Sequence, residues 1–339
     1  MKPSRTPHLL VVGAGNAALT AALAAHESGA AVSIFEKAPP KEWGGNSRFS
    51  GGVFRFGYDS SADIRDLVST RPPHPVDIPA YSSTDYFDDL LTTSGRQANY
   101  DLVLTLAEHS LATVQWMSTH GVRWEYSKIF GVESEGGIRY PAGTAVQAAG
   151  AGLGLMDRLH SAIISRGIVI HYNTPMKYLI KEGTRVTGIV VQDNDKEESI
   201  RADGVILAAG GFEANAEMRR QYLGEPWHDV TVRGSRFDTG EVLREALDIG
   251  AVRHGQWGGC HATPVAADAP SMGKLELTDT SNRLSYPYGI TVNIHGNRFM
   301  DEGATEASHS YARMGREILK QPDRLAYQIF DSNTVSLLE

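Results

Sequence analysis

The sequence predicts an α/β fold, α+β overall, on three observations. A short apolar run at residues 8–12 leads into a glycine motif and an alanine-rich helical stretch, and a second strand pattern follows at 31–36. Three strand patterns between residues 176 and 202 are separated by turn residues and predict a β-meander. Because strand and helix patterns alternate early in the chain, the first strands should form a parallel sheet.

The first strand, at 8–12, is apolar on both faces, as is typical of a buried parallel strand. We expect the helix after it to end near Ser28, because Gly29 follows directly. The segment from Ala31 to Glu36 then completes a βαβ unit.

Two helical regions follow. A block from about Thr84 to His120 is ended by Gly121 and has one clear apolar face, formed by Val103, Leu106, Ser110, Val114 and Met117. A second helix follows the glycine-rich stretch at 143–154, and its predicted face carries Met156, Leu159, Ile163 and Ile164.

The strand patterns of the second half are at 168–172, 176–181, 186–192, 198–202 and 205–208. A helix should begin at Asp238-Thr239-Gly240-Glu241 and end near Gly250. From about Gln256 the chain becomes rich in Gly, Pro, Thr and His, so we expect a domain boundary there. The first domain is predicted at 1–255, with a helical insertion at about 60–130, and the second at 256–339.

Composition excludes several classes of protein. Lys and Arg number 32 against 40 Asp and Glu, and the net charge of −8 argues against non-specific nucleic-acid binding. The single cysteine, Cys260, excludes an internal disulfide and a cysteine-rich metal site, and no metal is expected. The sequence contains neither a signal-peptide pattern nor an apolar run long enough for membrane insertion, so we expect a cytoplasmic protein.

The first glycine motif predicts a dinucleotide site. Gly13-x-Gly15-x-x-Ala18 stands between strand and helix, where glycines allow a tight turn and a close approach to a pyrophosphate. Glu36 ends the next strand, where an acid would bind a ribose 2′-OH and repel the 2′-phosphate of NADP. The alternative is a tight turn with no ligand.

A second glycine-rich loop lies at residues 44–52. Its paired glycines and small polar residues would let backbone amides and hydroxyls surround phosphates and approach a flavin ring. The alternative is a flexible surface loop.

Several stretches, in order, resemble the fumarate reductase / succinate dehydrogenase flavoprotein superfamily. They are VVGAGNAALTAALAA, VSIFEKAP, GGNSRFSGG, TSGRQANYDLVLTLAEHSLATVQWM, ADGVILAAGGFEAN, DTGEVLREALDIGA and GITVNIHGNRFMDEG. Within it, YARMGREILKQPDRLAYQIFD is most similar to the tricarballylate dehydrogenase branch. The resemblance implies a Rossmann-like FAD-binding domain with an inserted cap, which would be incomplete here because members continue well past the equivalent of Glu339.

The resemblance also implies the FAD contacts. The residues that match the family's cofactor loops are Gly13, Ala14, Gly15, Glu36, Lys37, Gly45, Asn46, Ser47, Gly51, Gly52, Met176, Ala209, Gly210, Gly211, Thr239 and Gly240. Members with a covalent flavin place a histidine in the second loop. Asn46 is the nearest counterpart here, so we expect non-covalent FAD.

The implied catalytic residues are less well matched. His261 resembles the family histidine that binds a substrate carboxylate, and the alternative is a hydrogen-bonded loop histidine. Tyr311 takes the place of the arginine that transfers the proton in fumarate reductases, and Arg313 is two residues away. The family's Thr-Glu substrate pair has no match between Thr278 and Tyr288. Cations available for carboxylates are Arg48, Arg55, Arg298 and Arg313, although each is as readily a surface residue and Arg298 would pair with Asp301 or Glu302.

The leading functional hypothesis is oxidation of a small polycarboxylate, tricarballylate to cis-aconitate, by hydride transfer to flavin N5. A fumarate reductase or another flavin desaturase, such as a 3-ketosteroid dehydrogenase, is the second hypothesis. A non-catalytic FAD-binding fragment is the third. No haem or iron–sulfur cysteine motif is present, so a separate electron-acceptor protein is expected.

Overall fold

The computed structural model describes residues 6–72, 74–134, 136–304 and 307–338. Its central element is a four-stranded sheet with the strand order β13-β1-β2-β9, and all neighbouring strands are parallel. This confirms the predicted fold class, and the strand limits agree with the prediction to within one or two residues. The four strands are β1 (His8–Val12), β2 (Ala31–Phe35), β9 (Val169–His171) and β13 (Gly204–Leu207).

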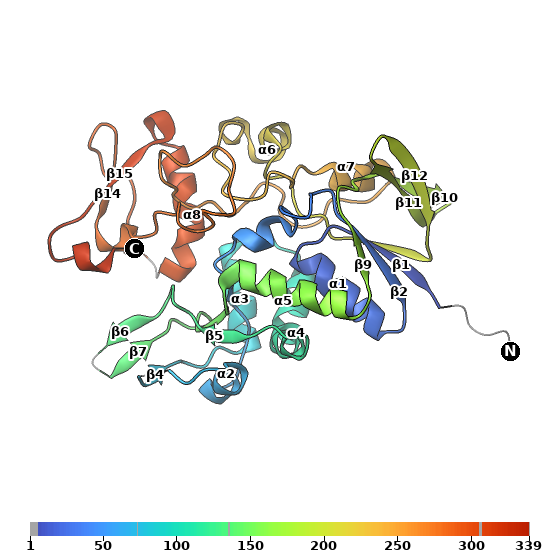
Figure 1. Cartoon of the computed structure of the whole chain (residues 1–339). Coiled ribbons are helices and arrows are strands. Elements are labelled where there is room, and N and C mark those ends of the chain that lie inside the picture. Colours follow the sequence, from blue (N-terminus) through green and yellow to red (C-terminus); the bar gives the residue numbers. More distant parts are fainter. Residues whose placement is uncertain (1–5, 73, 135, 305–306, 339) are drawn as a thin grey trace.

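The parallel sheet is the middle of three layers (Figure 1). On one face lie the helices α1 (Asn16–Glu27) and α5 (Ala151–Ser165), and Val11 of β1 joins their core. On the other face lies the predicted meander, and Leu10 and Val12 pack against it. Successive residues of a strand point to opposite faces, which explains why the run is apolar throughout. The meander consists of β10 (Met176–Glu182), β11 (Arg185–Asp193) and β12 (Lys196–Arg201).

The register of this sheet brings three chain segments together. Val12 is paired with Phe35 of β2 on one side and with Leu207 of β13 on the other. The three strands are parallel, so the residues that follow them meet at one edge. These residues begin at Gly13, Glu36 and Ala208, which are far apart in the sequence.

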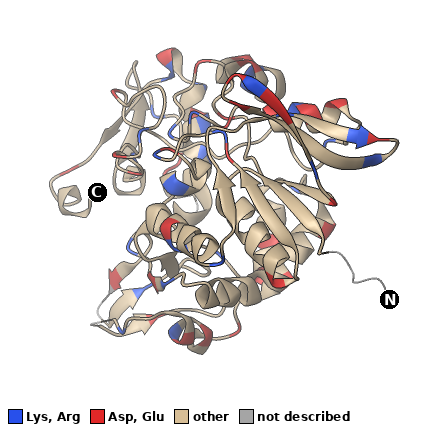
Figure 2. Cartoon of the chain, turned by 45° about the vertical axis from the view of Figure 1, so that its right-hand side comes forward, with Lys and Arg blue, Asp and Glu red and all other residues tan. Residues whose placement is uncertain are grey.

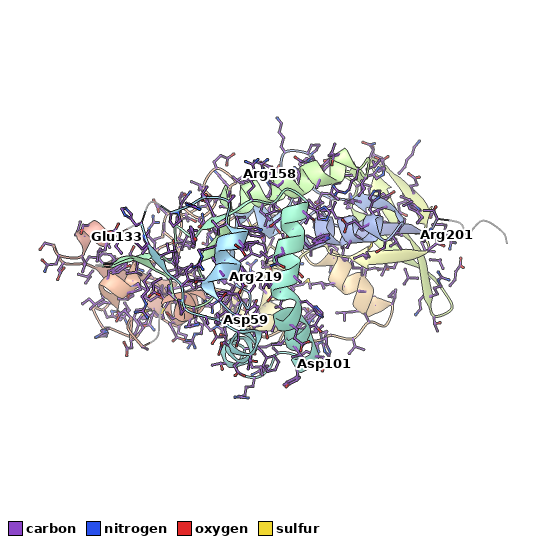
Figure 3. All side chains as sticks on the ribbon, turned by 90° about the horizontal axis from the view of Figure 1, so that it is seen from below. Asp59, Asp101, Glu133, Arg158, Arg201 and Arg219 are labelled. Carbon is purple, nitrogen blue, oxygen red and sulfur yellow. The ribbon has the colours of Figure 1, made fainter. Side chains whose placement is uncertain are left out.

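The predicted helical block is wrong as one continuous helix. It forms α3 (Ser83–Thr93) and α4 (Tyr100–Thr119), because Gly95 and Arg96 adopt left-handed backbone angles that end a helix. Asp101 lies near the beginning of α4 (Figure 3). Ala107 is buried in the apolar face of α4, whereas Leu106 is 49% exposed.

The apolar face predicted for α5 is also partly wrong. Met156, Leu159 and Ile163 are fully buried, but Ile164 is 52% exposed. One residue turns an α-helix by about 100°, so Ile164 cannot share the buried face with Ile163. The helices α1 and α5 nevertheless share one apolar core with residues of the sheet, such as Val11 and Ile34.

The region predicted as a helical insertion at about 60–130 also contains strands. Besides α2 (Ser61–Leu67), α3 and α4, the chain forms two small sheets whose strands lie before, within and after this region. One has the order β3-β8-β5, in which Trp124 is 1% exposed, and the other has the order β4-β7-β6. Their strands are β3 (Val53–Phe54), β4 (Val76–Asp77), β5 (Trp124–Tyr126), β6 (Val132–Ser134), β7 (Gly137–Arg139) and β8 (Val146–Ala148).

The C-terminal part has few regular elements from the point where the composition changes. Between residues 251 and 285 the chain forms turns and isolated bridges. It then forms an antiparallel pair, β14 and β15, beside α8 (Figure 1). The boundary at residue 256 stays a prediction. The elements of this half are α6 (Ala216–Leu223), α7 (Glu241–Asp248), β14 (Ile290–Asn293), α8 (Ala307–Leu319) and β15 (Ala326–Ile329).

Charged residues of both signs are interspersed over the chain (Figure 2). In the part of the chain that the structure describes, no helix is long and apolar enough to cross a membrane.

Candidate functional site

The turn between β1 and α1 requires glycine. Gly13 has a φ of +106°, and a Cβ atom there would lie 2.4 Å from the carbonyl oxygen of Ala208. The turn therefore packs directly against the end of β13. The turn ends at Gly15, and α1 begins directly after it. The N-terminus of α1, where the helix dipole is positive, therefore lies at the sheet edge.

Glu36 is turned toward the backbone of this turn. Its side chain is 7% exposed, and its carboxylate accepts hydrogen bonds of 2.7 Å from the backbone N–H groups of Ala14 and Ala38. Burial raises the pKa of Glu36, while these hydrogen bonds and Lys37 oppose the rise. In this arrangement Glu36 fixes the glycine turn, and its predicted contact with a ribose stays a prediction.

The second glycine loop lies against the beginning of α1. It forms a short 3₁₀ helix, η1 (Gly45–Phe49), and the Ser47 hydroxyl accepts a hydrogen bond from the backbone N–H of Asn16 at 3.0 Å. The Asn46 side-chain oxygen accepts a hydrogen bond of 2.8 Å from the backbone N–H of Ser235. The loop is thus fixed between the helix and the chain before α7, and it is not a loose surface loop.

Two further segments complete the walls. Gly210 follows β13 with a φ of +76°, and Met176, which is 6% exposed, begins β10. Lys37 pairs with Glu241 of α7 at 3.0 Å and donates a hydrogen bond to Thr239. The sheet edge is therefore joined to the beginning of α7.

These segments enclose a cavity of about 800 Å³. Its size lies within the range of about 300–1,000 Å³ that small-molecule and cofactor sites occupy. All predicted FAD contacts line it except Gly51, Gly52 and Thr239. Gly52 packs against Ala151, and Gly51 lines a neighbouring cavity of about 210 Å³.

Asp238 is the most unusual residue of the large cavity, and sequence reasoning missed its role. The side chain is 5% exposed, and its Oδ2 atom has no hydrogen-bond partner among the residues that the structure describes. Burial, followed by the nearby carboxylate of Glu213, raises the pKa of Asp238 to about 7. The only sequence signal was its place before Thr239-Gly240, where it looked like the beginning of a helix.

The segment that carries Glu213 is held by Arg219 of α6. Arg219 is 5% exposed, and its guanidinium donates hydrogen bonds to the backbone oxygens of Glu213, Trp227 and His228 at 2.5, 2.8 and 2.5 Å. The Glu213 side chain lies over Gly211 and lines the cavity, and desolvation raises its pKa. Arg219 therefore supports one wall of the site from behind.

The predicted catalytic residues divide into two groups. His261 and Tyr311 lie together, with their rings in a T-shaped arrangement and the centroids 5.1 Å apart. Desolvation and the positive charge of Arg233 lower the pKa of His261, although His261 is itself an exposed residue. Burial raises the pKa of Tyr311, while the cations Arg55 and Arg233 oppose the rise. Arg313 is exposed on α8 and does not join this pair in the structure.

Three of the four predicted carboxylate-binding arginines already have partners. Arg55 forms an ion pair with Asp89 at 3.4 Å, and Arg298 pairs with Glu302 at 2.5 Å, as the structural alternative predicted. Arg48 lies over the ring of Trp43, 5.3 Å from its centroid.

Arg233, which sequence reasoning missed, acts electrostatically on both His261 and Tyr311. It forms an ion pair with Asp279 at 2.6 Å and donates a hydrogen bond to the backbone oxygen of Phe49. No motif in its surroundings distinguished it from other arginines.

The geometry defines a class of protein. A glycine turn at a parallel strand, a second glycine loop at the same helix N-terminus and a large cavity at the sheet edge are the features of a dinucleotide-binding flavoprotein. The sequence of the chain matches the family of the FAD binding domain over residues 8–329. The chain therefore belongs to this FAD-binding family, and its cofactor is FAD.

Similar proteins are FAD-dependent oxidoreductases. The chain is 31% identical over 336 residues to a probable fumarate reductase of Shewanella frigidimarina. The matched residues cover 97% of this chain and 51% of that protein. It is 33% identical over 177 residues to a 3-oxosteroid 1-dehydrogenase of Mycobacterium tuberculosis, covering 49% of this chain and 30% of that protein. The open conformation of a flavocytochrome c3 fumarate reductase superposes with a TM-score of 0.70 and 28% identity, covering 99% of this chain and 54% of that chain.

The chain spans about half the length of the curated fumarate reductases that it matches. The comparisons bear out the superfamily resemblance, the fold, the cofactor and the general class of enzyme. They show fumarate reductases and a steroid dehydrogenase as relatives, and none of the proteins named above is a tricarballylate dehydrogenase.

Proposed function

We propose that the protein is an FAD-dependent oxidoreductase that acts on the carbon–carbon bond of a small polycarboxylate, with tricarballylate and cis-aconitate as the leading substrate pair. The observation that carries this proposal is the pair formed by His261 and Tyr311, whose ring centroids lie 5.1 Å apart beside the ion pair of Arg233 with Asp279. A steroid site would be lined by apolar and aromatic residues instead. Guanidinium and imidazole groups, by contrast, bind carboxylates.

The reaction balances as a two-electron oxidation. One carbon loses a hydride and its neighbour loses a proton, which leaves a carbon–carbon double bond. FAD, when bound, accepts the hydride. His261 would bind a substrate carboxylate, and Tyr311 would exchange the proton because it lies beside His261 whereas Arg313 is exposed. A separate protein would accept the electrons from the flavin.

Reduction of fumarate is the second candidate, and sequence similarity favours it, because relatives named as fumarate reductases are 28–31% identical to this chain. A reductase must donate a proton to its substrate. The Tyr311 phenol carries a proton at neutral pH, but burial raises its pKa and makes it a weaker acid than an ordinary phenol.

The test is an absorption spectrum of the FAD-loaded chain during anaerobic additions. Bleaching by tricarballylate supports the leading proposal. Bleaching by only succinate or only a 3-ketosteroid identifies that compound as the substrate class. Reoxidation of chemically reduced flavin by fumarate supports the second candidate, a fumarate reductase. Flavin that responds to none of these compounds overturns both substrate proposals.

Matched variants test the residues. His261→Ala should raise KM about tenfold, because a lost carboxylate contact is worth about 1.4 kcal/mol. His254→Ala removes an exposed histidine and should leave KM unchanged. Tyr311→Phe should lower kcat and leave the flavin spectrum unchanged, whereas Tyr327→Phe changes a side chain that is 58% exposed and should alter neither. Equal effects of the two histidine variants on KM would contradict the role of His261.

A further inference from the structure

Six carboxylates line the FAD cavity, and three of them, Glu36, Glu213 and Asp238, differ in what holds them. Glu36 accepts two backbone hydrogen bonds, and Glu213 lies over Gly211 at the edge of the cavity. Asp238 is more deeply buried, at 5% exposure, and its Oδ2 lacks a partner among the described residues. A buried polar atom without a partner is costly and marks a place where a ligand atom would complete the hydrogen bonding.

Asp238 lies between the two loops that approach the cofactor. A Cβ atom placed on Gly210 would be 2.6 Å from the Asp238 Oδ1, and one placed on Gly45 would be 3.6 Å from it. Both glycines and Asp238 line the same cavity. The carboxyl group is therefore directly beside backbone that would contact FAD.

The charges around Asp238 favour the neutral carboxyl group. Burial is the largest cause that raises its pKa to about 7, and the carboxylates of Glu213 and Glu36 add to the rise. Lys37 and the backbone N–H of Asn46 oppose it, but Lys37 is already paired with Glu241. The pyrophosphate of FAD is a dianion, and its approach would favour the neutral form further.

We propose that Asp238 positions the cofactor by donating a hydrogen bond from its protonated carboxyl group to an acceptor atom of FAD, and that ionisation of this group weakens FAD binding. The inference rests on FAD as the cofactor and is independent of the substrate proposed above. A protonated buried carboxyl group is a hydrogen-bond donor, whereas its ionised form only accepts and would repel the dianion.

The proposal gives a definite pH dependence. If only the protonated form binds, the dissociation constant for FAD rises up to about fiftyfold between about pH 7 and pH 9. Asp238→Asn keeps an N–H donor of similar shape and cannot ionise, so its dissociation constant should change less than about threefold over the same range. Asp248→Asn removes an exposed carboxylate from the rim of the same cavity and should retain the pH dependence of the natural chain.

The experiment is a fluorescence titration of the full chain with FAD at several pH values between 6 and 9, for the natural protein and the two variants. A steep pH dependence that is lost only in Asp238→Asn supports the proposal. An equal pH dependence in all three proteins overturns it, and so does affinity that is independent of pH in the natural chain. A natural chain that binds no FAD at any pH overturns the cofactor assignment together with this inference. Normal FAD binding without turnover would count only against the proposed substrate.

Discussion

Replacement of Asp238 by asparagine should stabilise the flavin-free protein, and more so as the pH rises. Asp238 is almost fully buried and its pKa is raised from 3.8 to about 7. A group whose pKa is higher in the folded state stabilises the fold fully below its unfolded pKa. That contribution is lost as the pH rises through about 7.

The magnitude follows from the pKa values. A difference of about three pKa units corresponds to about 4 kcal/mol, because each unit is worth 1.36 kcal/mol. Asp238→Asn should therefore be more stable than the natural chain by about 1.7 kcal/mol at pH 5, and by nearly the full 4 kcal/mol at pH 8. The stability gained by Asp238→Asn should therefore increase by about 2–3 kcal/mol between these pH values.

Urea unfolding of both proteins without flavin, at pH 5 and pH 8, measures this change. Asp248→Asn is the control, because its carboxylate is exposed, and its difference from the natural chain should be the same at both pH values. A constant difference between Asp238→Asn and the natural chain would refute the reasoning. It would show that the carboxyl group ionises in the folded protein as easily as in the unfolded chain.

Three other predictions concern the walls of the site. Arg219→Ala should cost about 3 kcal/mol in urea unfolding, because three part-buried carbonyls lose their donor at about 1 kcal/mol each. Arg220→Ala, at an exposed neighbour, should change stability by less than about 1 kcal/mol. Gly152→Ala would place a methyl group 2.2 Å from a carbonyl of the second glycine loop and should weaken FAD binding at least about tenfold, whereas Gly136→Ala, with open space around it, should bind FAD normally. Because Asn46 replaces the histidine that carries a covalent flavin, acid precipitation should release the flavin into the supernatant, and flavin that stays with the pellet would contradict this.

The sequence predicts well what depends on local chemistry. The βαβ unit and the meander were predictable because apolar runs and turn glycines follow each other closely. The break between α3 and α4 was missed although Gly95 is a residue that commonly ends a helix, and the left-handed angle of Arg96 beside it carries no sequence signal. The short strands around Trp124 were missed as well, because two or three residues are too few to show a period.

Parts of the candidate site were likewise predictable from the sequence, and other parts were not. The glycine loops carry recognisable spacing, so most of the cofactor cavity could be predicted. Arg233 and Asp238 have no motif, and their importance comes from residues that are distant in the sequence, such as Asp279 and Glu213. Only the fold shows that these groups lie together.

The parallel pairing of β13 with β1 has a consequence for how the protein is made. The backbone N–H of Ala208 donates a hydrogen bond to Val12, so the walls of the cavity meet only after the chain has closed a loop of nearly two hundred residues. Helices and the meander form from neighbouring residues without this step. A cofactor that binds only the closed sheet adds its binding energy to that last event. Yellow colour in a preparation of this protein would therefore report that the sheet has been completed, which helix content alone does not reveal.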